Sequence, residues 1–323
     1  MKSLSQYSKI LCLIVWTIAI LFCSILIQSC NSDKKQSNKQ PIKVEMENVI
    51  EIITENMDFQ IPDTISSGWN TFRYKNKSSQ THFFIIDKYP EGITLKEIDN
   101  LVMPYFNSGM KLINEGKSEE GFAEFGKLPD WFSEVQFLGG SGLISPGKHT
   151  ETMIKLDPGF YIVECYVKMS NGVFHTSMGM IKELIVSETN SGNTELKADI
   201  NIDISSTEGI VFNDSISSGK HTFSVFFKDQ IVHENFSGHD INLTKLGENA
   251  NLEDLENWMN WADPKGLIEP SPTDITFLGG VNNMPAGNKG FFTVDLQPGN
   301  YALISEVPNA LSKNMLKTFV VKD

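Results

Sequence analysis

Cysteine is scarce in this chain, and its scarcity limits the chemistry that the protein can use. The 323 residues include four cysteines, and Cys12, Cys23 and Cys30 all fall in the first 30 residues. Cys165 is the one cysteine in the rest of the chain, so that part cannot form an internal disulfide. A lone thiol in a folded body is either buried and inert, or it serves as a metal ligand or nucleophile.

Basic runs are also missing. The formal net charge is −13, and no stripe of Lys and Arg interleaved with aromatic residues occurs. Binding to nucleic acid or to an anionic membrane surface needs such a basic footprint. The sequence therefore predicts that nucleic acid is not a partner.

The motifs of common enzyme classes are absent as well. The sequence contains no G-x-S-x-G nucleophile elbow and no G-x-G-x-x-G or G-x-x-x-x-G-K-[ST] loop. The glycine-rich FLGG segments at 137 and 277 lie between β-type segments, which favours turns over phosphate-binding loops.

A long apolar run occurs at the N-terminus. Residues 10–30, ILCLIVWTIAILFCSILIQSC, follow Lys2 and Lys9 and are long enough for a signal sequence or a membrane span. The ending at Cys30 resembles a bacterial lipoprotein signal, in which the cysteine is lipidated and becomes the mature N-terminus. We therefore expect a signal peptide at 1–30 and a flexible tether at 31–44. An uncleaved N-terminal membrane anchor is the alternative.

This resemblance implies a location as well. It places the protein in the bacterial cell envelope, held to the membrane by its lipid and facing the periplasm, most simply at the outer membrane.

The rest of the chain repeats itself. DTISSGWNTF from Asp63 matches DSISSGKHTF from Asp214, and the segment from Phe137 aligns without gaps to the segment from Phe277. A Ser/Asn/Gly/Thr-rich stretch separates the copies. We expect a first domain at 45–188, a linker at 189–198 and a second domain at 199–323.

Each copy has the pattern of a β protein. Segments such as HTFSVFF and FYIVECYV are rich in β-branched and aromatic residues and are separated by PG, GG and NG turns, which indicates a sandwich or barrel. Between His82 and Phe137 the first copy has helical periodicity, with Leu95, Ile98 and Leu101 expected to pack on the sandwich. The second copy keeps a shorter version, NLEDLENWMNW.

The order of these features resembles the cupredoxin family of blue copper proteins. The specific part is His82, then DPGFYIVEC ending at Cys165, then HTSMGM from His175 to Met180. The His-x-x-x-Gly-Met ending is similar to plastocyanins, and the ten-residue step from Cys to His is similar to copper nitrite reductases. The resemblance implies an all-β fold of two tandem Greek-key β-sandwiches, the first with a helical insertion.

The resemblance also implies one type 1 copper site in the first copy. Such a site needs two imidazoles, a thiolate and a weak axial thioether. His82, Cys165, His175 and Met180 would supply them, with Met178 as the alternative axial ligand. Asn171-Gly172 is a tight turn that would return the chain toward Cys165.

The second copy lacks most of these ligands. Ser305 replaces the cysteine, and Ala310 or a neighbour replaces the second histidine, while His239 and Met315 remain. We expect this copy to bind no metal.

Two functions stay open. The first is a lipid-anchored copper protein for electron transfer or copper handling, with a redox or envelope protein as partner. The second is a metal-free, cupredoxin-like envelope module that binds a protein or ligand. All six histidines are isolated in the sequence, whereas the enzymes of this family need paired histidines for further copper ions, so an enzyme is not expected.

Overall fold

The computed structural model describes residues 49–323. The expected signal peptide, the lipidation site Cys30 and the tether at 31–44 lie outside the described residues. Glu47–Asp323 forms one compact unit. In the described part of the chain, no helix is both long enough and apolar enough to span a membrane.

The first half of this unit contains seven strands and a helical insertion between β3 and β4. The strands are β1 (Val49–Thr54), β2 (Thr64–Asn76), β3 (Ile85–Lys88), β4 (Gln136–Gly140), β5 (His149–Leu156), β6 (Gly159–Glu164) and β7 (Ile181–Asn190). The helices are α2 (Leu95–Leu101), α3 (Met103–Asn114), α4 (Ser118–Phe125), and the short 3₁₀ turns η1 (Asp130–Glu134) and η2 (Thr176–Met178).

The second half repeats the arrangement with one α-helix. Its strands are β8 (Ile200–Ser205), β9 (Gly209–Phe212), β10 (Ile216–Ser217), β11 (Gly219–Phe227), β12 (Ile241–Leu246), β13 (Ile275–Val281), β14 (Lys289–Leu296), β15 (Gly299–Ile304) and β16 (Leu316–Lys322). The helices are the 3₁₀ turn η3 (Glu234–Phe236) and α5 (Leu252–Trp258).

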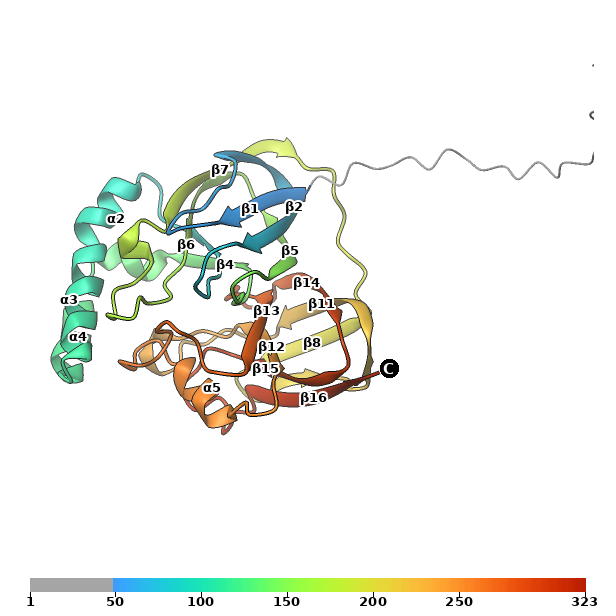
Figure 1. Cartoon of the computed structure of the whole chain (residues 1–323). Coiled ribbons are helices and arrows are strands. Elements are labelled where there is room, and N and C mark those ends of the chain that lie inside the picture. Colours follow the sequence, from blue (N-terminus) through green and yellow to red (C-terminus); the bar gives the residue numbers. More distant parts are fainter. Residues whose placement is uncertain (1–48) are drawn as a thin grey trace, which may run out of the picture. The chain divides into compact units, whose positions relative to one another are not determined.

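Figure 1 labels most strands of the two halves, and in each half one stretch of chain passes from one pairing partner to another. The start of β2 pairs in parallel with β7, and from Gly68 onward β2 pairs with β5. The second half repeats this with β10 on β16 and, from Gly219 onward, β11 on β14. Both glycines have positive φ, +89° and +123°, which side-chain-bearing residues rarely adopt. The result is two tandem β-sandwiches, the first with a helical insertion.

The two halves share a sheet. Strand β5 pairs antiparallel with β14, with Thr152 opposite Phe292. Beyond the sheet, the Lys168 N–H donates to the Leu267 carbonyl at 2.7 Å, and the Thr81 N–H donates to a Glu269 carboxylate oxygen at 2.6 Å. The expected domain boundaries at 188 and 199 stay a prediction, and the halves on either side of them are hydrogen-bonded together.

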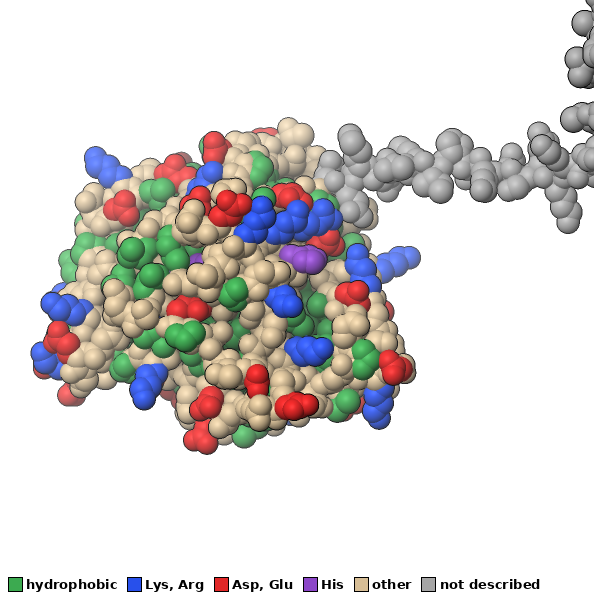
Figure 2. Space-filling view, in the orientation of Figure 1, with side chains coloured by type: hydrophobic (Ala, Val, Ile, Leu, Met, Phe, Trp, Pro, Cys, Tyr) green, Lys and Arg blue, Asp and Glu red, His purple; other side chains and the backbone are tan. Residues whose placement is uncertain are grey.

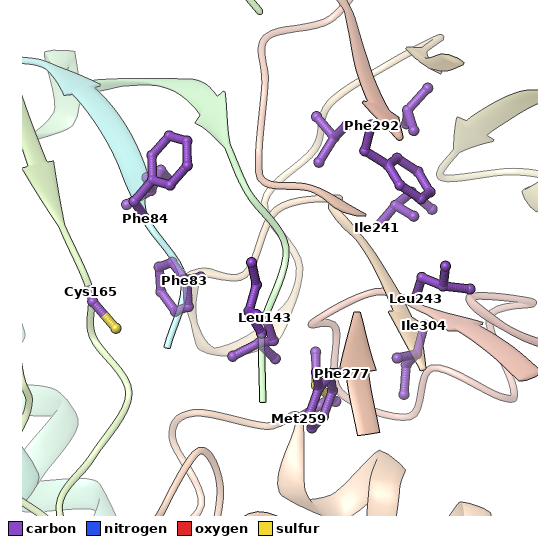
Figure 3. Close-up of a cluster of buried hydrophobic side chains, with 14 of the residues drawn as sticks. Phe83, Phe84, Leu143, Cys165, Ile241, Leu243, Met259, Phe277, Phe292 and Ile304 are labelled. Atoms are coloured by element: carbon purple, nitrogen blue, oxygen red, sulfur yellow. The ribbon is translucent and has the colours of Figure 1, made fainter. Parts of the chain in front are cut away.

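A buried apolar cluster runs through both halves. In Figure 3 the Cys165 side chain points from its strand toward Phe83, beside Phe84 and Leu143. Further along the same cluster lie Phe277 and other residues of the second half. Cys165 is therefore enclosed by packed side chains.

One expectation about the helical insertion is wrong. Ile98 is buried, but Leu101 is 43% exposed. Helix α2 ends at Leu101, and the chain changes direction at Val102 before α3 begins, so Val102 takes the buried position instead.

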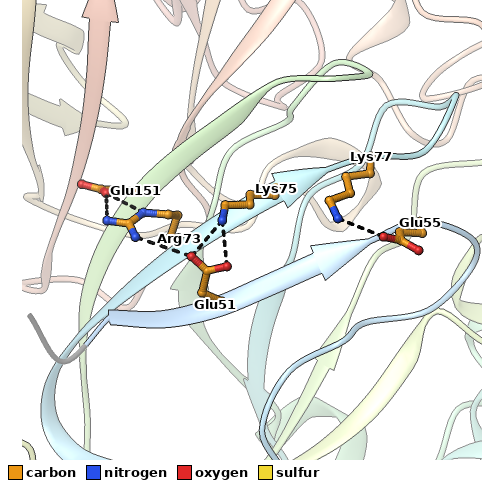
Figure 4. Close-up of polar contacts among 6 residues, drawn as sticks. All are labelled: Glu51, Glu55, Arg73, Lys75, Lys77 and Glu151. Carbon is orange, nitrogen blue, oxygen red and sulfur yellow. Dashed lines mark hydrogen bonds and ion pairs between the residues drawn. The ribbon is translucent and has the colours of Figure 1, made fainter.

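The surface carries charges of both signs. On the face drawn in Figure 2, Lys and Arg side chains lie among Asp and Glu side chains. Across β1, β2 and β5, Lys75 pairs with Glu51 at 2.8 Å and Arg73 with Glu151 at 2.6 Å (Figure 4). Partly exposed pairs of this kind contribute about 1 kcal/mol or less each, so burial of the core dominates stability.

Candidate metal centre

The candidate ligands come from two parts of the chain, His82 from one and the loop from Cys165 to His175 from the other. His82 lies just before β3 and is fixed by two backbone hydrogen bonds with Ile144, of 3.2 and 2.7 Å. Cys165 directly follows β6. His175 follows a hairpin and begins the turn η2. Each ligand is therefore positioned by backbone that the sandwich itself holds.

The donor atoms form a compact triangle. His82 Nδ1 and His175 Nδ1 lie 3.1 Å apart, and Cys165 Sγ lies 3.8 Å from each of them. The point equidistant from all three therefore lies about 2.1 Å from each atom, close to the metal–nitrogen and metal–sulfur bond lengths of about 2.0–2.3 Å. The residues present thus fit a metal ion without any rearrangement of these three atoms.

All three side chains are fully buried. Burial, with a smaller contribution from the nearby His175 ring, lowers the pKa of His82 to about 3. Burial lowers the pKa of His175 to about 4 and raises the pKa of the Cys165 thiol to about 12. Without a metal, the cluster at neutral pH therefore consists of two neutral imidazoles and a neutral thiol.

The second ring nitrogens are unusual. His82 Nε2 and His175 Nε2 are both buried and have no hydrogen-bond partner in the structure. Ligating histidines commonly donate this N–H to a carboxylate or carbonyl. Here the ring orientation is instead fixed by packing and by the Nδ1 contacts.

The loop after Cys165 returns His175 to the cluster. The Asn171-Gly172 turn closes a hairpin, in which the Met169 N–H donates to the Val173 carbonyl at 2.8 Å. Gly172 has a φ of +81°, which explains why glycine is needed there. The expected tight turn is present, and it brings the chain back toward β6.

Backbone hydrogen bonds then lock the ends of this loop. The His175 N–H donates to the Val167 carbonyl at 2.8 Å, and the Met180 N–H donates to the His175 carbonyl at 3.0 Å. The Cys165 N–H in turn donates to the Met180 carbonyl at 3.2 Å. Cys165, His175 and Met180 are thus neighbours through the main chain.

The two candidate axial ligands differ in environment. Met180 is fully buried in the same apolar cluster as Cys165. Met178 is 51% exposed. Gly179 separates them with a φ of +106°, which turns the chain between an outward and an inward methionine. Exposure therefore favours Met180.

The corresponding position in the second half has other contacts. Ser305 Oγ donates to Asp240 Oδ1 at 2.9 Å. His239 Nε2 lies 2.7 Å from His233 Nε2, and its Nδ1 lies 3.5 Å from Asp229 Oδ1. These residues supply no thiolate, and the His239 imidazole, which corresponds to that of His82, contacts His233 and Asp229 instead.

Sequence reasoning missed four carboxyl groups, of which Asp87, Asp240 and Glu306 are buried and Glu164 is half-buried. Asp87, Glu164, Asp240 and Glu306 are all raised in pKa, chiefly by burial, with Glu164 at about 7 and Asp240 at about 6. The available signal was an acidic residue inside an apolar strand, as in YIVEC and LISEV.

Comparison with known proteins matches this chain only to solved structures. No protein-family model matches the sequence, and no curated protein does. Among solved structures, the chain is similar to auracyanin A, a "blue" copper protein from Chloroflexus aurantiacus, with 25% identity, 43% of this chain and 98% of that chain covered, and a TM-score of 0.27. The chain is also similar to auracyanin from Roseiflexus castenholzii, with 22% identity and a TM-score of 0.27. This match covers 43% of this chain and 97% of that chain.

A longer stretch is similar to the Cu-containing nitrite reductase from Thermus scotoductus, with 12% identity, 85% of this chain and 61% of that chain covered, and a TM-score of 0.21. The fold follows from the strand pairing described above, and the site follows from its three donor atoms.

Proposed function

We propose that the first half binds one copper ion in a type 1 site, for electron transfer or copper handling. The observation that carries this proposal is the triangle of His82 Nδ1, His175 Nδ1 and Cys165 Sγ. A thiolate with two imidazoles is a donor set that suits copper, and bound copper supplies one-electron redox chemistry. Met180 would supply the thioether, because it is buried in the same cluster and its carbonyl accepts from the Cys165 N–H.

The protein's own contribution is to hold the ligands in place and to exclude water. Ile144, Val167 and the Met180 carbonyl fix the three ligand segments through backbone bonds. Full burial shields the donor atoms from solvent. A ligand set that is held this rigidly changes little between two oxidation states, which supports electron transfer. None of the six histidines forms a His-x-His pair, so we propose no catalytic role.

The test is the visible spectrum after Cu(II) is added to the purified full chain. We expect an intense thiolate-to-copper charge-transfer band that disappears in Cys165→Ser and persists in the matched control Met178→Leu. Cys165→Ser keeps the other three cysteines, so loss of the band assigns it to Cys165. A folded protein that stays colourless and binds no copper would refute the proposal and favour the metal-free envelope module.

We also propose that the protein is anchored in the cell envelope by a lipid on Cys30, where a membrane or envelope redox partner would be accessible. The support is the apolar run at 10–30 that ends in this cysteine. Mass spectrometry of the protein isolated from bacterial membranes tests it. A mature N-terminus at Cys30 carrying acyl chains is expected, and an intact N-terminus at Met1 would indicate the uncleaved anchor instead.

A further inference from the structure

A pocket of about 730 Å³ lies between the helical insertion and the second half. This volume is within the range of about 300–1,000 Å³ that small-molecule sites occupy. Its aromatic walls come from the insertion, from the hairpin before His175 and from loops of the second half. The aromatic residues of these walls include Phe106, Phe125, Phe132, Phe174, Phe236 and Trp261.

The aromatic walls form a continuous set of rings across the two halves. The ring centroids of Phe106 and Phe125 lie 5.2 Å apart, and those of Phe125 and Trp261 lie 5.8 Å apart. The ring centroids of Phe236 and Phe125 lie 6.3 Å apart. The Phe236 side chain is 62% exposed, so it lies at the edge of the pocket. A ligand entering past Phe236 would therefore meet ring faces on several sides.

The charged groups that line the pocket are all acidic. Glu306 lines it and is only 6% exposed. Its Oε2 accepts a hydrogen bond from the Tyr166 hydroxyl at 3.0 Å, but its Oε1 is buried and has no partner. Asp130 and Glu164 also line the pocket, and none of the described residues that line it is Lys, Arg or His. Glu306 thus brings a buried acceptor without a donor to the wall of the pocket.

The nearby Lys168 ammonium group does not donate a hydrogen bond to Glu306 Oε1. Its charge lowers the pKa of Glu306, but burial outweighs that effect and holds the pKa well above the usual range. The Lys168 Nζ donates instead to the carbonyls of Trp261 and Asp263, at 2.9 and 2.8 Å.

We propose that this pocket binds a small organic ammonium compound, with its apolar body against the aromatic rings and its cationic head at Glu306. Aromatic faces attract ammonium groups, and more strongly where water is excluded. A bound ammonium group favours the ionised form of the Glu306 carboxyl and would give its Oε1 the charge-assisted hydrogen bond that it lacks. The acidic lining disfavours an anionic ligand. This binding goes beyond the copper proposal and does not depend on it.

The experiment measures binding of three matched probes to the full chain by calorimetry. 2-Phenylethylammonium, 2-phenylethanol and 3-phenylpropanoate present a cation, a neutral group and an anion on the same ring. We expect the ammonium probe to bind at least about tenfold more tightly than the alcohol, because it forms a charge-assisted contact. The anion should bind most weakly. Equal affinity for cation and alcohol, or no binding of any probe at millimolar concentration, would overturn the proposal.

Two variants locate the site. Glu306→Gln should remove the preference for the cation and leave alcohol binding unchanged, whereas Glu253→Gln, on the exposed face of α5, should change neither. Phe236→Ala should weaken cation and alcohol together, and it truncates a mostly exposed side chain, so folding should be kept. Retention of the cation preference in a folded Glu306→Gln protein would refute the assignment. The copper spectrum, read separately, keeps this result distinct from the copper test.

Discussion

The two halves close the corresponding loop with the same pattern of backbone hydrogen bonds, but only one of them assembles metal ligands. In the first half, Cys165 N–H bonds to the Met180 carbonyl and Met180 N–H bonds to the His175 carbonyl, at 3.2 and 3.0 Å. In the second half, Ser305 N–H bonds to the Met315 carbonyl and Met315 N–H bonds to the Ala310 carbonyl, at 2.9 and 2.7 Å. The loop therefore does not need Cys165 or His175 in order to form.

What differs is how each half satisfies the buried groups at this place. The second half uses hydrogen bonds, with Asp240 accepting from Ser305 Oγ, the Glu306 N–H and Asn242 Nδ2. The first half instead places two ring nitrogens, His82 Nδ1 and His175 Nδ1, and the Cys165 thiol directly against one another, at 3.1 and 3.8 Å. Such groups are costly to bury unless they have another use. The comparison therefore supports a metal-binding role for the first half.

His175→Ala should have the largest effect, since it gives the first half the residue found at 310. Loss of a direct ligand should weaken copper binding by at least about 100-fold, more than typical losses of supporting contacts. Competition titration against a copper chelator measures this. His149→Ala, an exposed histidine on β5, is the control and should keep full affinity. Equal affinity in both variants would remove His175 from the site.

Asp240→Ala should destabilise the second half. It leaves the Ser305 hydroxyl, the Glu306 N–H and the Asn242 amide without an acceptor, which should cost about 3 kcal/mol in the free energy of unfolding. Urea denaturation of the metal-free protein measures this cost, with the exposed Asp295→Ala as control.

The pH dependence of that cost has a definite sign. Burial raises the pKa of Asp240 to about 6, from an ordinary value of 3.8. Between these values the folded protein holds a proton that the unfolded chain has released, so the stability supplied by Asp240 falls as pH rises through this window. Asp240→Ala should therefore cost more at pH 4 than at pH 7. A larger cost at pH 7 would contradict the assignment.

Copper affinity should rise by about tenfold per pH unit between roughly pH 5 and 8, because one proton is released for each ion bound. The released proton comes from Cys165, whose thiol has a pKa of about 12 without metal. The histidines release none, because their pKa values of about 3 and 4 leave both neutral in this range. Calorimetry in buffers of different ionisation enthalpy counts the protons. A count near three would show that the histidines are protonated before binding.

The reverse conversion should have the smallest effect. Ser305→Cys with Ala310→His restores the residue types in the second half, but His239 remains bonded to His233 and faces Asp229. We expect copper binding at least about 100-fold weaker than in the first half, since ring orientation is part of the site. A second charge-transfer band of equal intensity would show that two side chains suffice.

Much of this site could be predicted from the sequence. The repeat identified the strands, and the Cys165-to-His175 spacing with an Asn-Gly turn indicated that the loop returns. The exposure of the Met178 side chain could not be predicted from the sequence, because it depends on the left-handed backbone conformation at Gly179. The pairing of β5 with β14 could not be predicted from the sequence either, since local sequence does not specify the register between distant strands. Glu306 was missed because its burial arises where two halves meet.

The shared sheet also makes the two halves thermodynamically dependent on each other. Opening β14 removes the hydrogen-bonded neighbour of β5, and β5 pairs in turn with β2, whose end leads to His82. An ion that binds only the folded site stabilises every strand whose opening would disrupt that site. Copper should therefore slow amide hydrogen exchange in β14, in the half that has no ligands of its own.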